Sequence, residues 1–327
     1  MKKSVSLFFI VSLVTVMVMV QGCKKPTLPI IVTTEVSAVD LNTATSGGDI
    51  TSDGGEDIIA RGVCWNTTGD PTINDSKSSD GKGTGAFIST MTGLQKGSVY
   101  YVSAYATNSV GTSYGEQFMF STLINDVEGN KYKTVAIGSQ LWMAENLKAT
   151  LYNDNTQIPN VTLNAAWTTL TTDAYCWAQN DEATYKSLYG AIYNWYAVET
   201  GKLCPAGWHV PSDADFAAME INLGLTPIQA AAVEWRGTDQ GKQLKSTTGW
   251  NIGENGTNTS GFTALPAGYR AYATGISEGL GLITYWWTAI EQDAAMALYR
   301  RLDGNNEGVY RAATYKRAGK SVRCVKN

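Results

Sequence analysis

The stretch LCPAGWHVPSDADF, residues 203–216, decides how the C-terminal part of the chain folds. Ser212 and Asp215 have the spacing of a capping box, in which a hydroxyl and a carboxylate each bind a backbone amide at a helix start. The residues that follow place apolar side chains on one helical face and then a glycine, which is typical of a helix end: Phe216, Met219, Leu223 and Gly224. The pattern predicts a core-facing helix.

The only histidine of the chain, His209, lies just before this helix. Pro211 ends the preceding strand, in which Trp208 and Val210 point to one side and His209 to the other. A general base would need a nucleophile, and no serine in a glycine-flanked elbow occurs. We therefore interpret His209 as a polar, partly exposed strand residue, and we expect no catalytic residues.

Six blocks occur in order along the C-terminal part, of which LCPAGWHVPSDADF is the third. The others are DVEGNKYKTVAIGSQLWMAENLKATLYND, YGAIYNWYAV, GFTALPAGYR, YWWTAIE and GKSVRCVKN. Together they resemble the Fibrobacter succinogenes major paralogous domain, from about residue 126 to residue 327. That family resembles a branch of the C-type-lectin-like superfamily, so the resemblance implies an α+β domain that is rich in loops, over residues 123–327.

Composition divides the mature chain near Leu123. Nine of the ten tryptophans follow this residue. Residues 27–122 carry 4 Lys or Arg against 10 Asp or Glu, whereas residues 123–327 carry 17 against 19. Two domains are also the count expected for about 300 residues. Neither domain is basic, so we expect no nucleic-acid partner.

Short β-rich runs separated by turn residues predict an all-β sandwich over residues 32–122. Its clearest strand, residues 99–108, alternates two sets of side chains, and the better core set is Tyr100, Val102, Ala104 and Ala106. The runs GLQKGSVYYVSAYATNSVG and RGVCWNTT resemble a fibronectin type III-like (Ig-like) module. The resemblance implies that Tyr100 packs as a corner against the preceding turn. Cys64 is expected to be a buried free thiol.

The first residues read as an export signal: Lys2 and Lys3, an apolar run to Val20, and then VQGC. A cysteine at this place resembles the bacterial lipoprotein signal. It implies a signal peptide over residues 1–22, lipid on Cys23, a tether over residues 23–31, and a lipid-anchored protein of the cell envelope, at the outer membrane or cell surface. An ordinary cleaved signal and an uncleaved anchor are the alternatives.

Export also favours a disulfide. Cys204 precedes the Trp208 strand and Cys324 lies in the closing strand, so we expect these two to be linked. The bond would close a loop of about 120 residues and contribute roughly 2 to 5 kcal/mol. Cys176 is left over and could compete for either partner.

Metal and cofactor chemistry has little support. One histidine and dispersed cysteines cannot build a zinc site. The calcium-binding motifs of true C-type lectins are absent, and Cys324 stands alone where formylglycine-generating relatives have two close cysteines. We expect no metal and no cofactor. Four carboxylates beside aromatic residues, Glu145, Asp181, Glu182 and Glu291, keep a polysaccharide-active enzyme as a third hypothesis.

The preferred hypothesis is a non-enzymatic envelope lipoprotein whose lectin-like head binds a glycan or a protein, with the sandwich as spacer. The candidate ligand-binding residues are Arg270, Tyr272, Tyr285, Trp286 and Glu291. Strand alternation favours Trp286 as the exposed ring and Trp287 as the core ring. The rival hypothesis is a structural or assembly component of an envelope complex, with the basic residues near the C-terminus facing either solvent or an acidic partner.

Overall fold

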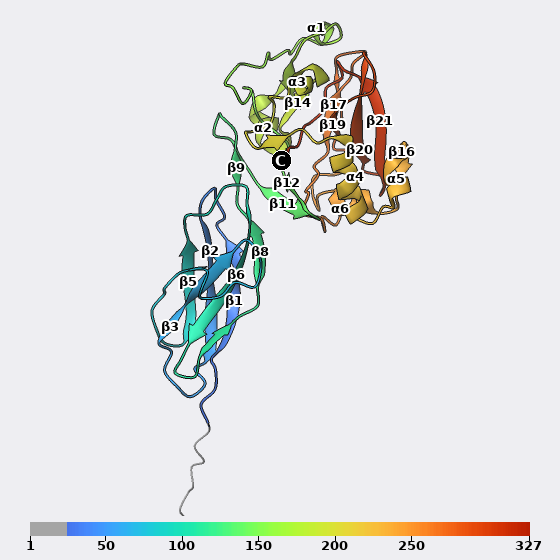
Figure 1. Cartoon of the computed structure of the whole chain (residues 1–327). Helices are drawn as coiled ribbons and strands as arrows, with labels where there is room; N and C mark the ends of the chain where they lie inside the picture. Colours follow the sequence, from blue (N-terminus) through green and yellow to red (C-terminus); the bar gives the residue numbers. More distant parts are fainter. Residues whose placement is uncertain (1–24) are drawn as a thin grey trace, which may run out of the picture.

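The computed structural model describes residues 25–327, which form a narrow β unit and a larger head joined end to end (Figure 1). The described chain begins at the end of the β unit that lies away from the head. The predicted signal peptide, residues 1–22, and the predicted lipidation site, Cys23, lie outside these residues. Among residues 25–327, no helix has the length and apolar character needed to cross a membrane.

The β unit is a sandwich of two antiparallel sheets. One sheet has the order β1-β2-β5, formed by Ile30–Ser37, Ala44–Ser52 and Gly85–Met91. The other has the order β4-β3-β6-β7, and β8 is also paired to β6. Its strands are β3 (Ala60–Asn66), β4 (Ser76–Lys77), β6 (Val99–Thr107), β7 (Thr112–Tyr114) and β8 (Phe118–Ser121). Strand β1 begins inside the range that we expected for the tether, so the sandwich starts at Ile30 and not at residue 32.

Strand β6 has the two faces predicted from its alternation. Tyr100, Val102, Ala104 and Ala106 are buried in the sandwich core. The Tyr100 hydroxyl accepts a hydrogen bond from the Gln95 N–H at 2.9 Å, which ties the strand to the preceding turn. Cys64 is a buried free thiol, and burial raises its pKa to about 12. This thiol is therefore protonated and unreactive at neutral pH.

Several hydrogen bonds join the sandwich to the head. The Ser121 hydroxyl donates to the Thr134 carbonyl at 2.8 Å, and Lys326 Nζ donates to the Gly97 carbonyl at 2.7 Å. Gly97 has a φ of 58°, and a Cβ atom there would lie 2.5 Å from Ile124 Cγ2. Only glycine fits this close approach, so the joint is tightly packed.

The head contains small sheets around a larger one. The small sheets have the orders β10-β9, β11-β12-β22-β15 and β13-β14. Their strands are β9 (Ile124–Asn125), β10 (Lys131–Tyr132), β11 (Thr134–Ile137), β12 (Gln140–Met143), β13 (Tyr175–Trp177), β14 (Ala191–Tyr193), β15 (Trp208–His209) and β22 (Val325–Lys326). The helices nearby are α1 (Asn164–Trp167), α2 (Glu182–Tyr189) and α3 (Trp195–Glu199).

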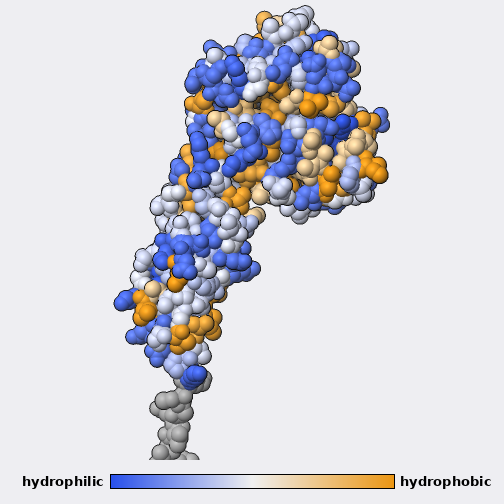
Figure 2. Space-filling view, viewed as in Figure 1, coloured by the Kyte–Doolittle hydropathy of each residue, from blue (hydrophilic) through white to orange (hydrophobic). Residues whose placement is uncertain are grey.

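The larger sheet has six strands in the order β16-β21-β20-β19-β17-β18. They are Glu234–Arg236, Val309–Tyr315, Met296–Asp303, Ile283–Glu291, Ala267–Arg270 and Ser277–Leu280. Helices α4 (Asp213–Asn222), α5 (Pro227–Ala231) and α6 (Gln240–Leu244) supply apolar side chains to the core on one face. The other face contributes to a second core that includes β13, β14 and α3. Apolar side chains are visible on the molecular surface near α5, where Ile228 is 85% exposed (Figure 2).

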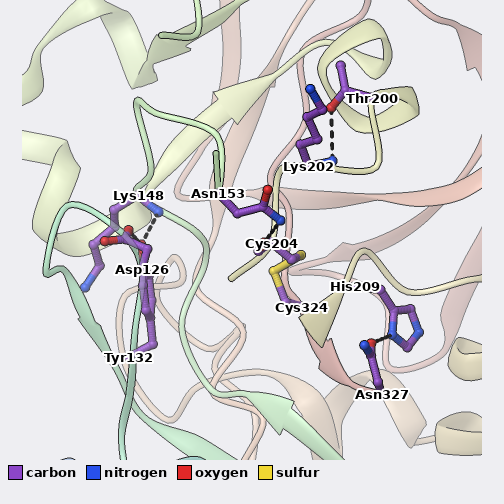
Figure 3. Close-up of a disulfide and its surroundings, with 10 residues drawn as sticks. All are labelled: Asp126, Tyr132, Lys148, Asn153, Thr200, Lys202, Cys204, His209, Cys324 and Asn327. Atoms are coloured by element: carbon purple, nitrogen blue, oxygen red, sulfur yellow. Dashed lines mark hydrogen bonds between the residues drawn. A yellow bond between two sulfur atoms is a disulfide. The ribbon is translucent and has the colours of Figure 1, made fainter. Parts of the chain in front are cut away.

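Helix α4 begins as the capping-box spacing predicts. The Ser212 hydroxyl accepts from the Asp215 N–H at 3.1 Å, and an Asp215 carboxylate oxygen accepts from the Ser212 N–H at 2.8 Å. The same carboxylate contacts His209 Nε2 at 3.1 Å, and His209 Nδ1 lies 2.7 Å from Asn327 Oδ1 (Figure 3). The histidine thus holds the helix start to the end of the chain.

Cys204 and Cys324 are joined by a disulfide, with their Cα atoms 5.9 Å apart (Figure 3). The bond links the loop before β15 to the segment that enters β22. Asn153 donates a hydrogen bond to the Cys204 carbonyl at 3.0 Å, which attaches a third segment to the same point. Cys176 is a buried free thiol whose pKa is raised to about 11 by burial.

Candidate functional site

Three of the five predicted ligand-binding residues are buried, namely Arg270, Tyr285 and Trp286. Trp286 is only 2% exposed and Trp287 is fully buried, so the prediction of an exposed Trp286 ring is wrong. The two rings do point to opposite faces of the sheet, but each face is covered there by a hydrophobic core. Trp286 lies in one core and Trp287 in the other. Trp286 packs against Phe262 with ring centroids 5.5 Å apart and donates to Asn146.

Arg270 is also fully buried, contrary to its predicted role in binding. Its guanidinium donates five hydrogen bonds to backbone and side-chain oxygens, and its carbon lies 4.4 Å from the centroid of the Trp167 ring. All five N–H groups of the side chain are therefore used. Arg270 holds the loop before α1 against β17 and has no free donor for a ligand.

Tyr285 belongs to a row of side chains that crosses the six-stranded sheet. Pairing places Trp235 opposite Tyr310, Tyr310 opposite Arg301, and Arg301 opposite Tyr285. On the other side of Tyr285 the row continues through Tyr269, whose ring centroid is 4.9 Å away, to Glu278. Paired residues of neighbouring strands share a face. We call these six residues the aromatic row.

The ends of the aromatic row are more exposed than its middle. Trp235 is 38% exposed and packs edge-on against Tyr310, with ring centroids 5.1 Å apart. Tyr310 and Tyr269 are half-buried, whereas Tyr285 is 7% exposed. The exposed rings offer flat apolar faces, and such faces suit stacking against a ligand.

Polar groups are fixed within the row. Arg301 binds Asp303 through two N–H groups, and its guanidinium lies about 5.5 Å from the rings of Trp235, Tyr310 and Tyr285. Burial opposes ionisation of Arg301, but the hydrogen bonds to Asp303 and the surrounding charges together outweigh it and raise the pKa of this guanidinium. Burial and the hydrogen bond to Glu278 raise the pKa of Tyr269 to about 12. Both groups are protonated donors at neutral pH.

A hollow of about 200 Å³ adjoins the row on the same face. Ile283 and Asp303 line it and are paired with each other, two residues along the strands from the pair of Tyr285 and Arg301. Leu282 and Glu254 complete its wall. The hollow has apolar sides and carboxylate oxygens beside a row of rings, which is the usual composition of a small-molecule site.

The remaining predicted residues, Tyr272 and Glu291, belong to a second cluster of side chains. The rings of Tyr272 and Tyr315 are 4.6 Å apart, and the Arg317 guanidinium lies over both. Glu291 is exposed and binds Lys316 at 3.0 Å. The five predicted residues therefore do not form one site. Tyr285 lies in the aromatic row, Tyr272 and Glu291 lie in this second cluster, and the other two are structural.

Most cations near the C-terminus have partners inside the protein. Arg300 and Arg311 both bind Asp213, and Arg300 shares the buried Glu220 with Arg236. These pairs hold α4 against the sheet. The prediction that the basic residues form a solvated face or a surface for an acidic partner is therefore wrong for Arg300 and Arg311. Their partner carboxylates belong to α4 of the same chain.

Trp235, Tyr310, Tyr269 and Arg301 were not identified as site residues from the sequence. The sequence does contain a partial signal for the row, because aromatic or cationic side chains recur at every second residue of neighbouring strands. Examples are Tyr285 with Trp287 and Tyr299 with Arg301. Alternation alone does not give the pairing of strands. Only the register places four such side chains in one line.

The carboxylates considered for glycoside hydrolysis have structural partners. Glu145 binds Lys148 at 2.6 Å, Glu182 binds Lys186 at 2.9 Å, and Asp181 accepts from the Thr184 N–H at the start of α2. Within residues 25–327, no group of three or more His, Cys, Asp and Glu side chains is placed to hold a metal ion.

The comparison with protein-family models identifies the head. The model of the Fibrobacter succinogenes major domain matches residues 135–326, which is more than half of the chain. The chain belongs to this family. The aromatic row lies wholly within the Fibrobacter succinogenes major domain, as does the disulfide. A comparison with curated proteins found no match.

The solved structures that resemble the chain cover about the length of the sandwich. A myokine structure is 20% identical and covers 30% of this chain and 98% of its own, with a TM-score of 0.23. A human fourth FNIII domain is 19% identical and covers 33% and 88%, with a TM-score of 0.24. The sensor domain of the anti-sigma factor RsgI4 in Pseudobacteroides cellulosolvens is 12% identical and covers 29% and 95%, with a TM-score of 0.23. The sandwich is fibronectin type III-like in its own strand order and in the Tyr100 corner.

Proposed function

We propose that this chain is a non-enzymatic, lipid-anchored protein of the cell envelope whose Fibrobacter succinogenes major domain binds a glycan through the aromatic row. The observation that supports this function is the row itself. The exposed ring of Trp235 and the half-buried rings of Tyr310 and Tyr269 supply stacking faces for sugar rings. Arg301, Asp303 and Tyr269 supply fixed donors and acceptors for hydroxyl groups.

The two-domain arrangement fits a spacer and a head. Lipidation of Cys23 would attach the protein to the outer membrane or cell surface at the end of the sandwich that lies away from the head. The sandwich would then hold the aromatic row above the bilayer, and the bonded joint at Gly97 would keep the head in one orientation. In this arrangement the membrane and an extracellular glycan are the partners, in adhesion or polysaccharide capture.

We also propose that the head is a variant of the C-type-lectin-like fold. Its short helices, small sheets and long loops support this assignment, as does the disulfide that closes on the last strand. The ligand surface proposed here requires no metal, cofactor or reaction, because it consists of ring faces and a neutralised Arg301–Asp303 pair.

A glycan array probed with the whole chain tests the function, followed by affinity measurements on variants. Trp235→Ala and Tyr310→Ala should each weaken binding by about fivefold or more, since each removes about 1 kcal/mol or more of stacking. Folding should change little for Trp235→Ala, because the ring is 38% exposed. Tyr114→Ala is the matched control, an equally exposed ring on the sandwich.

Two outcomes would count against this function. If no glycan binds, or if a glycan binds equally well to both row variants, the row is not the ligand surface. A loss of binding in Tyr315→Ala alone would move the surface to the cluster of Tyr272, Tyr315 and Arg317. Recovery of an envelope protein that requires the row would favour the rival hypothesis of an assembly component.

A further inference from the structure

A cavity of about 210 Å³ lies in the head, lined by segments around β12, α2 and β22. Arg323 and Asn146 line its buried end and are 1% and 5% exposed. Ser187, Leu188 and Lys133 line it as well and are exposed. This gradient from exposed to buried residues shows that the cavity opens to solvent and ends at a guanidinium group.

Arg323 has fewer partners than its burial requires. Its guanidinium donates to Asn146 Oδ1 at 2.9 Å, to the Thr263 carbonyl at 3.0 Å and to the Phe262 carbonyl. A guanidinium carries five N–H donors, so two have no protein acceptor within the described chain. The carboxylate of Glu145, which also lines the cavity, forms its salt bridge with Lys148 and not with Arg323. The rings of Phe262 and Trp286, whose centroids lie 4.0 Å and 5.4 Å from the guanidinium carbon, offset part of the cost of burying this charge. A bound anion or water at the two free N–H groups would offset more of it.

The charges around the cavity favour an anion. Lys133, Lys148 and Arg323 line it, against a single carboxylate, Glu145. Glu145 is already bound to Lys148 Nζ at 2.6 Å and accepts from the Lys133 N–H at 3.2 Å. Arg323 and the Lys133 side chain are left without an acidic partner among the described residues.

Backbone strain marks the same cavity. Thr263, which lines it, has a φ of 56°, in the left-handed region that is unfavourable for a β-branched residue. This conformation is held by a hydrogen bond from its N–H to Asn258 Oδ1 at 2.7 Å, and the Thr263 carbonyl accepts from Arg323. Residues held in such conformations cluster at binding sites, where the surrounding structure offsets their cost.

We propose that this cavity binds a small organic carboxylate, such as the acid group of a uronic acid, with Arg323 as the residue that recognises it. The two free N–H groups of a planar guanidinium match the two oxygens of a carboxylate, and Lys133 adds a second positive charge at the mouth. The site is separate from the aromatic row, because the two share no residue.

Calorimetric titration of the whole chain with glucuronate, glucose and inorganic phosphate tests this site. Glucuronate should bind, and glucose should bind at least tenfold more weakly because it lacks the charge. Arg323→Met should weaken glucuronate binding at least tenfold, and Arg323→Lys should weaken it about as much if both oxygens are bound. Arg317→Met is the matched control, a partly exposed arginine elsewhere on the head that should leave the affinity unchanged.

A second kind of variant tests the cavity without replacing Arg323, so that its result does not depend on whether the arginine variants fold. Leu188→Trp fills the cavity from its exposed rim and keeps Arg323, so it should also weaken glucuronate binding at least tenfold. Tyr114→Ala changes an exposed ring on the sandwich, outside both proposed sites, and should leave glucuronate binding unchanged. Absence of glucuronate binding, equal binding by Leu188→Trp, or tighter binding of phosphate than of glucuronate would overturn the proposal.

Discussion

The head contains two fully buried arginines that differ in what surrounds them. Arg270 uses all five N–H groups on protein oxygens, whereas Arg323 uses three and lines a cavity. Neither forms a salt bridge with a carboxylate of the described chain. Burial lowers the pKa of Arg323 to about 9, so this side chain is still charged at neutral pH.

The comparison separates two uses of a buried cation. A guanidinium whose donors are all filled links segments that are distant in sequence, and it leaves nothing for a ligand. One that keeps free donors beside an opening retains part of its desolvation cost, which a bound anion can reduce. Exposure alone does not distinguish these two arginines. The count of hydrogen bonds does.

The largest effect is expected from Arg270→Met. The substitution leaves carbonyl and amide oxygens of the loop before α1 without donors, so it should cost roughly 3 to 5 kcal/mol of unfolding free energy. Urea unfolding of the whole chain measures it, with Arg317→Met as a control that should change stability by less than about 0.5 kcal/mol. A loss below about 1 kcal/mol would show that Arg270 is not a structural link.

The next effect is expected from removing the disulfide at Cys324, the residue after Arg323. Replacing Cys204 and Cys324 by serine opens a loop of 120 residues and should cost roughly 2 to 5 kcal/mol. The loosened segment should include the Met143 and Leu147 amides, which donate to the Cys324 and Val322 carbonyls. Hydrogen exchange should speed up there more than at the Arg270 amide. Uniform acceleration across the head would contradict this local role.

A smaller change is expected from Arg323→Met. The variant loses three hydrogen bonds but also removes an uncompensated buried charge, so the cost should be no more than about 1 to 2 kcal/mol. Urea unfolding beside Arg270→Met measures the contrast directly. Equal losses in the two variants would mean that both arginines are structural, and the distinction drawn from their hydrogen bonds would fail.

The sequence predicts local features well. The capping box of α4 and the core face of β6 each depend on residues within one element, and both are confirmed. The family assignment also follows from blocks that can be read along the chain.

Features that depend on distant segments were missed. Alternation showed that Trp286 and Trp287 face opposite ways, but not that α4 and α3 cover the two faces. The aromatic row depends on a register between Trp235 and Tyr310, and the cavity on five segments that are separate in the sequence. Neither leaves a periodic signal in the sequence.

Lys320, another buried cation of the head, extends the comparison to a group that can lose its charge. Its Nζ lies 3.9 Å and 4.1 Å from the ring centroids of Tyr285 and Tyr299. Burial, and then the nearby Arg301, lower the pKa of Lys320 well below its ordinary value of 10.5. Ring faces therefore offset only part of the cost of holding an ammonium group here.

This lowered pKa gives a pH dependence with a definite sign. Between the lowered pKa and 10.5, the unfolded chain binds a proton on Lys320 that the folded chain does not bind, so stability rises with pH. From pH 8 to pH 9 the stability of the wild type relative to Lys320→Met should increase by up to about 1.4 kcal/mol. Urea unfolding at the two pH values measures this difference, and other titrating groups cancel between the two proteins. If the stability difference stays constant or falls with pH, Lys320 keeps its proton in the folded state, and the rings of Tyr285 and Tyr299 stabilise the cation as fully as hydrogen bonds stabilise Arg270.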